Sequence, residues 1–206
     1  MNLKSTRIFL GGVLAALMLS AAFTGTAFAG PQWKFNETTL TGEEVIIGAA
    51  EKSALEISGI KTTCDNFLYE IKIKNSGGTG AGSVTDLPLF NCYTNGVCTV
   101  EAIEPWGFPW TAGLKTISTK NYIEIKGVHV NIVYGNEECA LYETEVEVTG
   151  TAGGLIDNAT ESATFNSSTF TTTGTQLWAF GTKVKWEGYF PAEGYEKHRL
   201  EKLTVS

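Results

Sequence analysis

The sequence predicts an all-β protein, an antiparallel β-sandwich or a closed, barrel-like sandwich of about a dozen short strands. Apolar and polar residues alternate with a period of two in many short stretches, as in strands that bury one face. Turn residues separate these stretches at hairpin spacing, and glycine is common, with 23 residues. The clearest turn signals are Asn75-Ser76-Gly77-Gly78, Asn95-Gly96, Gly153-Gly154 and Gly194.

The first 29 residues have the features of a cleaved signal peptide. Lys4 and Arg7 precede an apolar run over residues 9–23, and the segment closes with Ala27-Phe28-Ala29. A membrane anchor is less favoured, because the run is short and no basic cluster follows it. We therefore expect a signal peptide over 1–29, a single all-β domain over 30–206, and a secreted or cell-envelope location.

The mature chain is acidic. Loss of Lys4 and Arg7 lowers the formal charge from −7 to −9, because the removed segment contains no acidic residue. Such a chain is poorly suited to phosphate backbones and anionic lipid, so nucleic acid and stable membrane insertion are not expected.

Several stretches alternate clearly enough to assign their two faces. Phe67, Tyr69, Ile71 and Ile73 share one face of residues 67–74, and Val128, Val130, Ile132 and Tyr134 share one face of residues 128–134. In residues 142–148, the apolar face opposes a row of glutamates at 143, 145 and 147. Residues 121–127 and 182–190 alternate in the same way. Residues 149–175, rich in Thr, Ser and Gly, are expected to form an edge ribbon or a long loop.

The four cysteines, an even number in an exported chain, predict two disulfides. A two-residue turn at Asn95-Gly96 would place Cys92 and Cys98 on opposite faces of a hairpin, giving Cys64–Cys92 and Cys98–Cys139. A three-residue loop would instead allow Cys92–Cys98 and Cys64–Cys139. We favour the first pairing because Asn-Gly is the stronger two-residue turn. No C-x-x-C motif or close histidine pair indicates a metal or another cofactor.

Five segments occur in an order that resembles a group of small exported β-proteins of soil actinobacteria. The resemblance implies secretion, a β-fold and paired cysteines, and it implies nothing catalytic. The segments are LPLFNC (87–92), CTVEA (98–102), PWTAGL (109–114), IVYGNEEC (132–139) and YETEVEVTG (142–150).

The segment EAIEPWGFPWTAGL, residues 101–114, contains the candidate ligand-binding residues Trp106, Trp110 and Glu104. A proline precedes each tryptophan, so both are expected on irregular chain, where binding residues often concentrate. Exposed indoles stack on sugar rings or on apolar groups of a partner protein. For Trp110 a place in the core is favoured, which leaves Trp106 as the first candidate.

Catalytic chemistry has less support. His129 is expected on a polar face, and no G-x-S-x-G motif surrounds a serine. The Glu143, Glu145 and Glu147 row has members about 7 Å apart, a spacing that paired-carboxylate chemistry could use. No aromatic residue shares the row, and lysines of neighbouring strands, at 72 and 74 or at 183 and 185, are expected to face it.

We therefore expect an exported, non-enzymatic module that binds a cell-envelope or extracellular ligand, either a polysaccharide or a protein. One alternative is a carbohydrate-active enzyme of jelly-roll type. The other is a structural surface protein that assembles with copies of itself through exposed strand edges.

Overall fold

The computed structural model describes residues 29–57, 59–142, 145–165, 183–185 and 202–206. Within these ranges the protein is all-β, as predicted, with a small three-stranded sheet and a curled ten-stranded sheet, both antiparallel. Nearly all of the predicted signal peptide, residues 1–28, lies outside the described residues, as do Trp178, Trp186 and His198.

The small sheet joins the two ends of the described chain. β1 (Trp33–Phe35) pairs with β13 (Leu203–Val205) and with β2 (Thr38–Thr39). The amide of Asn75 links this sheet to the large one: its nitrogen donates to the carbonyls of Trp33 and Leu40, and its oxygen accepts from the Trp33 amide at 2.9 Å. The amide of Asn158 pairs twice with the main chain of Val205, at 2.7 and 2.9 Å.

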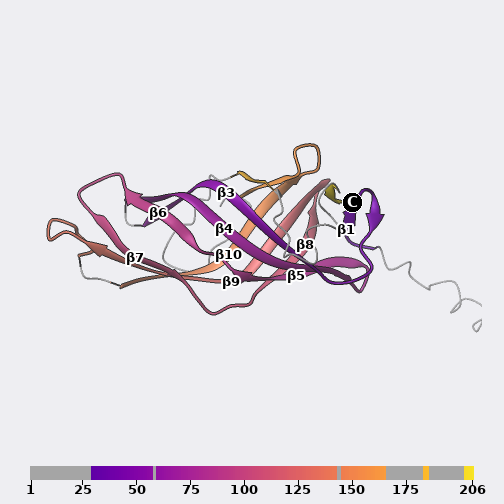
Figure 1. Cartoon of the computed structure of the whole chain (residues 1–206), viewed down its shortest axis with the longest axis horizontal. Coiled ribbons are helices and arrows are strands. Elements are labelled where there is room, and N and C mark those ends of the chain that lie inside the picture. The colour runs from indigo at the N-terminus through magenta and orange to yellow at the C-terminus, as the bar shows by residue number, and fades with distance from the viewer. Residues whose placement is uncertain (1–28, 58, 143–144, 166–182, 186–201) are drawn as a thin grey trace, which may run out of the picture.

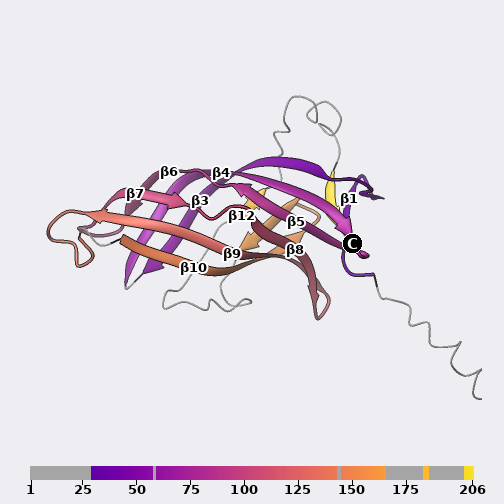
Figure 2. The same ribbon diagram turned by 90° about the horizontal axis from the view of Figure 1, so that it is seen from below.

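The large sheet is curled, and β10 pairs with β9 as well as with β11 (Figures 1 and 2). Among the described residues, β6 (Leu89–Thr94) pairs with β4 alone, and a single bridge joins Val184 of β12 to Ala50 of β3. The remaining order is β10 (Glu145–Asp157), β11 (Ser162–Phe165), β12 (Lys183–Lys185), β3 (Glu44–Ile57), β4 (Ile60–Ser76), β5 (Thr79–Asp86), β8 (Trp110–Ile117), β9 (Lys120–Gly135) and β7 (Thr99–Pro105).

Irregularities divide the long strands into two parts. Along β3 and β4 the buried side shifts by one residue near Lys52, which has a positive φ of 52°. In β9 and β10 the register shifts between Gly150 and Thr151, where Gly127 of β9, with a φ of +76°, has no opposite residue in β10. We call the part with β6, β7 and residues 53–64, 128–139 and 145–150 the disulfide end. The part with β5, β8, β11 and the small sheet is the hairpin end. The two ends lie at the left and right of Figure 1.

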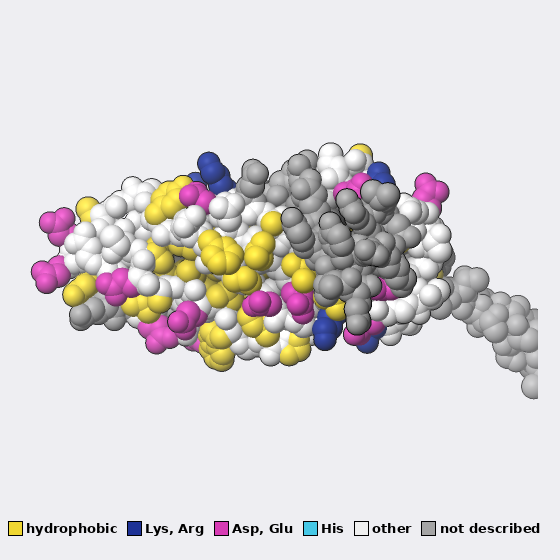
Figure 3. Space-filling view, in the orientation of Figure 1, with side chains coloured by type: hydrophobic (Ala, Val, Ile, Leu, Met, Phe, Trp, Pro, Cys, Tyr) yellow, Lys and Arg dark blue, Asp and Glu magenta, His cyan; other side chains and the backbone are white. Residues whose placement is uncertain are grey.

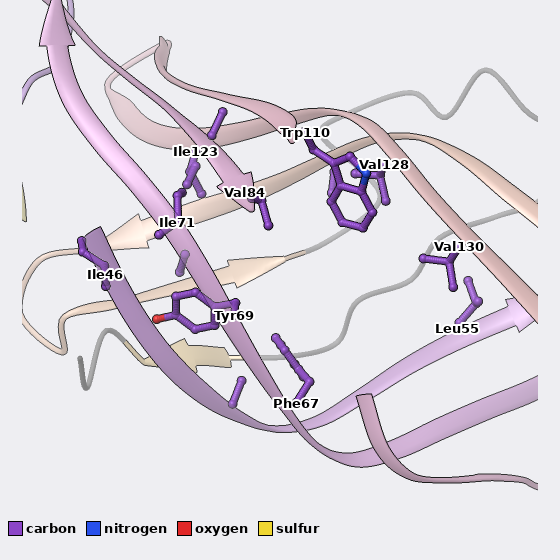
Figure 4. Close-up of a cluster of buried hydrophobic side chains, with 14 of the residues drawn as sticks. Ile46, Leu55, Phe67, Tyr69, Ile71, Val84, Trp110, Ile123, Val128 and Val130 are labelled. Carbon is purple, nitrogen blue, oxygen red and sulfur yellow. The ribbon is translucent and has the colours of Figure 1, made fainter. Parts of the chain in front are cut away.

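The core lies inside the curl, and the faces assigned from the sequence point into it. Phe67, Tyr69, Ile71 and Ile73 are buried, and so are Val128, Val130, Ile132 and Tyr134. Figure 4 shows part of this cluster, with side chains from β3, β4, β5, β8 and β9 directed toward a common interior. Alternation therefore identified the buried face of the long strands correctly.

Both favoured disulfides are present, but the hairpin used to predict them is absent. Cys64 is bonded to Cys92 and Cys98 to Cys139, with Cα atoms 3.9 and 4.7 Å apart. The strands on either side of Asn95 do not pair with each other: β6 pairs with β4, and β7 with β9. Cys92 lies directly opposite Cys64 in that register. Asn95 accepts from the Lys61 amide and donates its own amide to the Lys61 carbonyl, so it continues the β4–β6 pairing.

Two expectations about the glycine-rich segment were wrong in part. Gly153 and Gly154 do not form a turn but lie buried inside β10. Residues 149–157 are not a loop but part of β10, which pairs with β9 up to Leu155 and with β11 from Gly154 to Asp157. Gly154 is close to Phe165 and Ile123, so the absent side chain leaves room for its neighbours.

Candidate functional site

Trp106 lies just beyond the end of β7, on the irregular connection to β8. Pro105, which has no amide hydrogen, is the last residue of β7, and the Trp106 amide makes one more bond, to the His129 carbonyl of β9 at 3.0 Å. Gly107 then turns the chain with a φ of +73°, and a cis peptide bond joins Phe108 to Pro109. The Trp106 side chain is 45% exposed.

Trp110 supports this connection from inside the molecule. It is the first residue of β8, is 3% exposed, and points into the interior beside Val128 (Figure 4). Its indole nitrogen donates to the Trp106 carbonyl at 2.9 Å, and its ring stacks on Phe108 with centroids 4.5 Å apart. The two tryptophans of the candidate segment therefore have different positions, because Trp110 belongs to the core and only Trp106 meets solvent.

The Trp106 indole is held in place by two residues of β9. Its nitrogen donates to Oδ1 of Asn131 at 3.1 Å, and its ring packs on the ring of His129 with centroids 3.7 Å apart and planes inclined by 40°. Asn131 and His129 are two residues apart in a strand, so both side chains project from the same face. The face is the outer one, because the intervening Val130 is buried.

Two glutamates of β10 extend this arrangement. Asn131 donates through Nδ2 to Glu145 at 2.5 Å, and Nε2 of His129 contacts a carboxylate oxygen of Glu147. One network therefore connects the indole to both carboxylates, through the amide of Asn131 and the imidazole of His129. We call Trp106, His129, Asn131, Glu145 and Glu147, together with Glu104, the Trp106 surface.

Glu104 belongs to the same face by register. It lies opposite Asn131 in the β7–β9 pair, and Asn131 in turn lies opposite Glu147 in the β9–β10 pair. Directly opposed residues share a face, so Glu104, Asn131 and Glu147 form one row across three strands. The backbones of its two glutamates are two strand spacings apart, about 10 Å. Glu104 is exposed and has no hydrogen bond or ion pair with any described residue.

The expectations for the glutamate row are partly correct. Glu145 and Glu147 are exposed, as expected for the outer face, and Glu143 lies outside the described residues. The predicted lysine neighbours are wrong: the opposed residues in β9 are Val133 and Asn131. No aromatic residue shares the row itself, but Trp106, from the β7–β8 connection, is linked to Glu145 through Asn131.

The sequence did not indicate a role for Asn131, and it predicted His129 only as an exposed residue on a polar strand face. The His129 side chain is only 21% exposed, between Trp106 and Glu147. Alternation in residues 128–134 had placed both side chains on the outer face. It could not show that β7 and β10 flank β9, because that pairing joins residues far apart in the sequence.

The described residues around His129 include no hydrogen-bonded nucleophile. His129 contacts Trp106 and Glu147, and no described serine, threonine or cysteine hydrogen-bonds to it. All four cysteines are in disulfides. Within the described ranges, no group of three or more His, Cys, Asp and Glu side chains is arranged to hold a metal ion.

No helix in the described part of the chain has the length and apolar character needed to cross a membrane. The two disulfides are consistent with an oxidising extracellular environment. Comparisons with protein-family models, with curated proteins and with solved structures gave no significant match to this chain.

Proposed function

We propose that the protein is an exported, non-enzymatic module that binds an extracellular or cell-envelope polysaccharide through the Trp106 surface. The observation that supports this best is an exposed indole whose polar edge is already bonded to the protein. Because Nε1 donates to Asn131, the ring offers a ligand its flat, apolar face. A sugar ring also has a flat apolar face, which can stack on the face of the indole.

The indole is already fixed in one conformation, so binding a ligand should cost little conformational entropy. Trp106 is held by its amide, its ring nitrogen, its carbonyl and the packing of its ring on His129, which together restrict both the side chain and its loop. A group held in one conformation before binding loses little entropy when a ligand arrives. The carboxylates beside it accept hydrogen bonds from sugar hydroxyls, which would orient the ring on the indole.

Two further proposals concern the shape of the large sheet and the location of the protein. We infer that the curled sheet is a closed, barrel-like sandwich, which the continuous path of strand pairs from β3 through β9 and β10 to β12 supports. Export is supported by the pattern of residues 1–29 and by the two disulfides.

Binding to immobilised polysaccharides tests the proposal. Wild-type protein is expected to be retained by at least one insoluble or gel-embedded glycan, and Trp106→Ala is expected to lose at least tenfold in affinity, as stacking residues in binding sites commonly do. Tyr93→Ala is the matched control, because Tyr93 is 48% exposed but lies on β6. Equal loss in both variants, or retention unchanged by Trp106→Ala, would contradict this assignment.

A carbohydrate-active enzyme is the second candidate, and the Glu104–Asn131–Glu147 row favours it. Flexible glutamate side chains about 10 Å apart at the backbone can bring their carboxyl groups into the roughly 6.5–9.5 Å range of inverting glycosidases. Such an enzyme would release reducing ends from its glycan, and Glu104→Gln and Glu147→Gln would each abolish that release. If a retained glycan is not cleaved, binding without hydrolysis remains the function.

A further inference from the structure

The Trp106 surface combines an exposed aromatic ring with uncompensated negative charge. Glu104, Glu145 and Glu147 are all exposed, and no lysine or arginine of the described chain forms an ion pair with any of them. Among the described residues, His129 is the one basic side chain in contact with these carboxylates. The outer face of β9 also carries Lys126, but its ammonium is paired with Glu124 at 3.0 Å, beyond the irregularity at Gly127.

One face of the molecule has a similar character. In the face shown in Figure 3, hydrophobic side chains cover the central and left-hand part, and acidic side chains surround them at the left end and along the lower side. Lysine and arginine side chains are sparse there. An acidic, partly apolar surface on a chain of net charge −7 repels anionic ligands and favours cationic ones.

We propose that the ligand of the Trp106 surface is a cationic glycan, a polymer of hexosamine units with free amino groups. This inference rests on the proposed polysaccharide-binding function and names the class of glycan. A protonated amine over the indole face gains a cation–π attraction, for which tryptophan is the best aromatic partner. The sugar ring that carries the amine supplies the apolar contact.

The carboxylates are placed to meet such amines on both sides of the indole. Glu104 precedes Trp106 by two residues and has no partner in the described chain, so its carboxylate is available to an ammonium group. Glu145 and Glu147 each use one oxygen on Asn131 or His129 and retain lone pairs for a further donor. Ammonium groups on successive sugars would therefore meet carboxylate acceptors at Glu104 on β7 and at Glu145 and Glu147 on β10, while the indole contacts β9 between these strands.

Two oligosaccharides that differ only at nitrogen provide the test. Titration calorimetry compares the glucosamine hexamer with the N-acetylglucosamine hexamer, at mildly acidic pH and low salt. We expect the free-amine hexamer to bind about 10-fold more tightly, since its charges add cation–π and carboxylate interactions. Its advantage should shrink as salt approaches about 1 M, where the Debye length falls to about 3 Å.

Variants separate this inference from the proposed function. Glu104→Gln is expected to weaken the free-amine hexamer about 3-fold and to leave the acetylated one unchanged. Glu43→Gln removes the same charge from the exposed Glu43–Lys74 pair outside the Trp106 surface, and should change neither. Trp106→Ala should weaken both.

Three outcomes would overturn the inference. If the acetylated or a neutral hexamer binds as tightly as the free-amine one, the site binds glycans without selecting amines, and the proposed function stands alone. If polylysine competes as well as the hexosamine polymer, the surface recognises cationic peptides rather than sugars. If no glycan binds, the proposed function fails as well.

Discussion

At the hairpin end, β5 has strand partners on both sides, β4 and β8, and it follows β4 through a turn at Gly77 and Gly78. At the disulfide end, the only described strand partner of β6 is β4, and that of β7 is β9. Each of these two edge strands is tied by a disulfide, Cys92 of β6 to Cys64, and Cys98, just before β7, to Cys139. Where main-chain pairing is one-sided, covalent links hold the strands in place.

The largest expected effect is at the hairpin end, where Trp33→Ala would remove the side chain that joins the small sheet to the large one. Trp33 is 1% exposed, and its ring nitrogen donates to the Ala81 carbonyl at 3.3 Å. We expect a loss of about 4 kcal/mol in the free energy of unfolding, measured by urea denaturation. A loss below about 1.5 kcal/mol would show that the small sheet contributes little to the hairpin end.

At the disulfide end, removal of either disulfide should lower the free energy of unfolding by nearly as much as Trp33→Ala does. The two cysteines of Cys64–Cys92 are separated by 28 positions in the sequence, and those of Cys98–Cys139 by 41. Replacing either pair by alanine is expected to cost about 3–4 kcal/mol, with the longer loop slightly more important.

Amide hydrogen exchange locates that effect. Loss of Cys98–Cys139 should speed exchange in β7 while β5 and β8 remain protected, because the edge strand opens locally. Uniform loss of protection over both ends would mean that they unfold as one unit, and the contrast between them would disappear.

Gly82→Ala tests how closely strands approach at the hairpin end. A Cβ at Gly82 would lie 2.3 Å from the carbonyl oxygen of Lys72, a backbone atom of the paired strand β4 that cannot rotate away. We expect a loss of about 2–3 kcal/mol in thermal or urea unfolding. Gly42→Ala is the control, since no atom lies within 4 Å of its added Cβ, and its stability should be unchanged or slightly raised.

The smallest effect appears only at alkaline pH and compares one buried tyrosine from each end. Burial raises the pKa of Tyr69 at the hairpin end and of Tyr134 at the disulfide end, and a hydrogen bond with Thr62 partly offsets the shift for Tyr134. Because the unfolded phenols ionise near pH 10 while the folded ones keep their protons, stability is full below that pH and falls above it.

Each tyrosine contributes a slope of up to about 1.4 kcal/mol per pH unit. Tyr69→Phe should therefore flatten the decline of unfolding free energy above pH 10, as measured by urea denaturation across that range. An unchanged slope in Tyr69→Phe would show that Tyr69 does not resist ionisation in the folded protein.

The sequence predicted local features well and pairing poorly. Alternation located the buried face of Phe67, Tyr69, Ile71 and Ile73 because side-chain direction in a strand depends only on its neighbours in sequence. The strand partners of Cys92 lie elsewhere in the chain, so the correct disulfides were reached through an Asn95-Gly96 hairpin that does not form.

The candidate site was likewise predictable only in its local part. Irregular chain after Pro105 was visible in the sequence, and it led to Trp106 and Glu104. His129, Asn131 and Glu147 join them only because β9 lies between β7 and β10, which is a property of the folded sheet. Residues assembled by distant pairing have no spacing in the sequence that would identify them.

The two hydrogen bonds between Asn158 and Val205 have a practical consequence for producing the protein. Asn158-Ala-Thr160 is an N-glycosylation sequon, and the amide nitrogen that a glycan would occupy is the one that donates to Val205. A eukaryotic secretory host that modified this asparagine before folding would attach a sugar to the nitrogen that faces the Val205 carbonyl and crowd the C-terminal strand at that contact. Expression in bacteria avoids that competition.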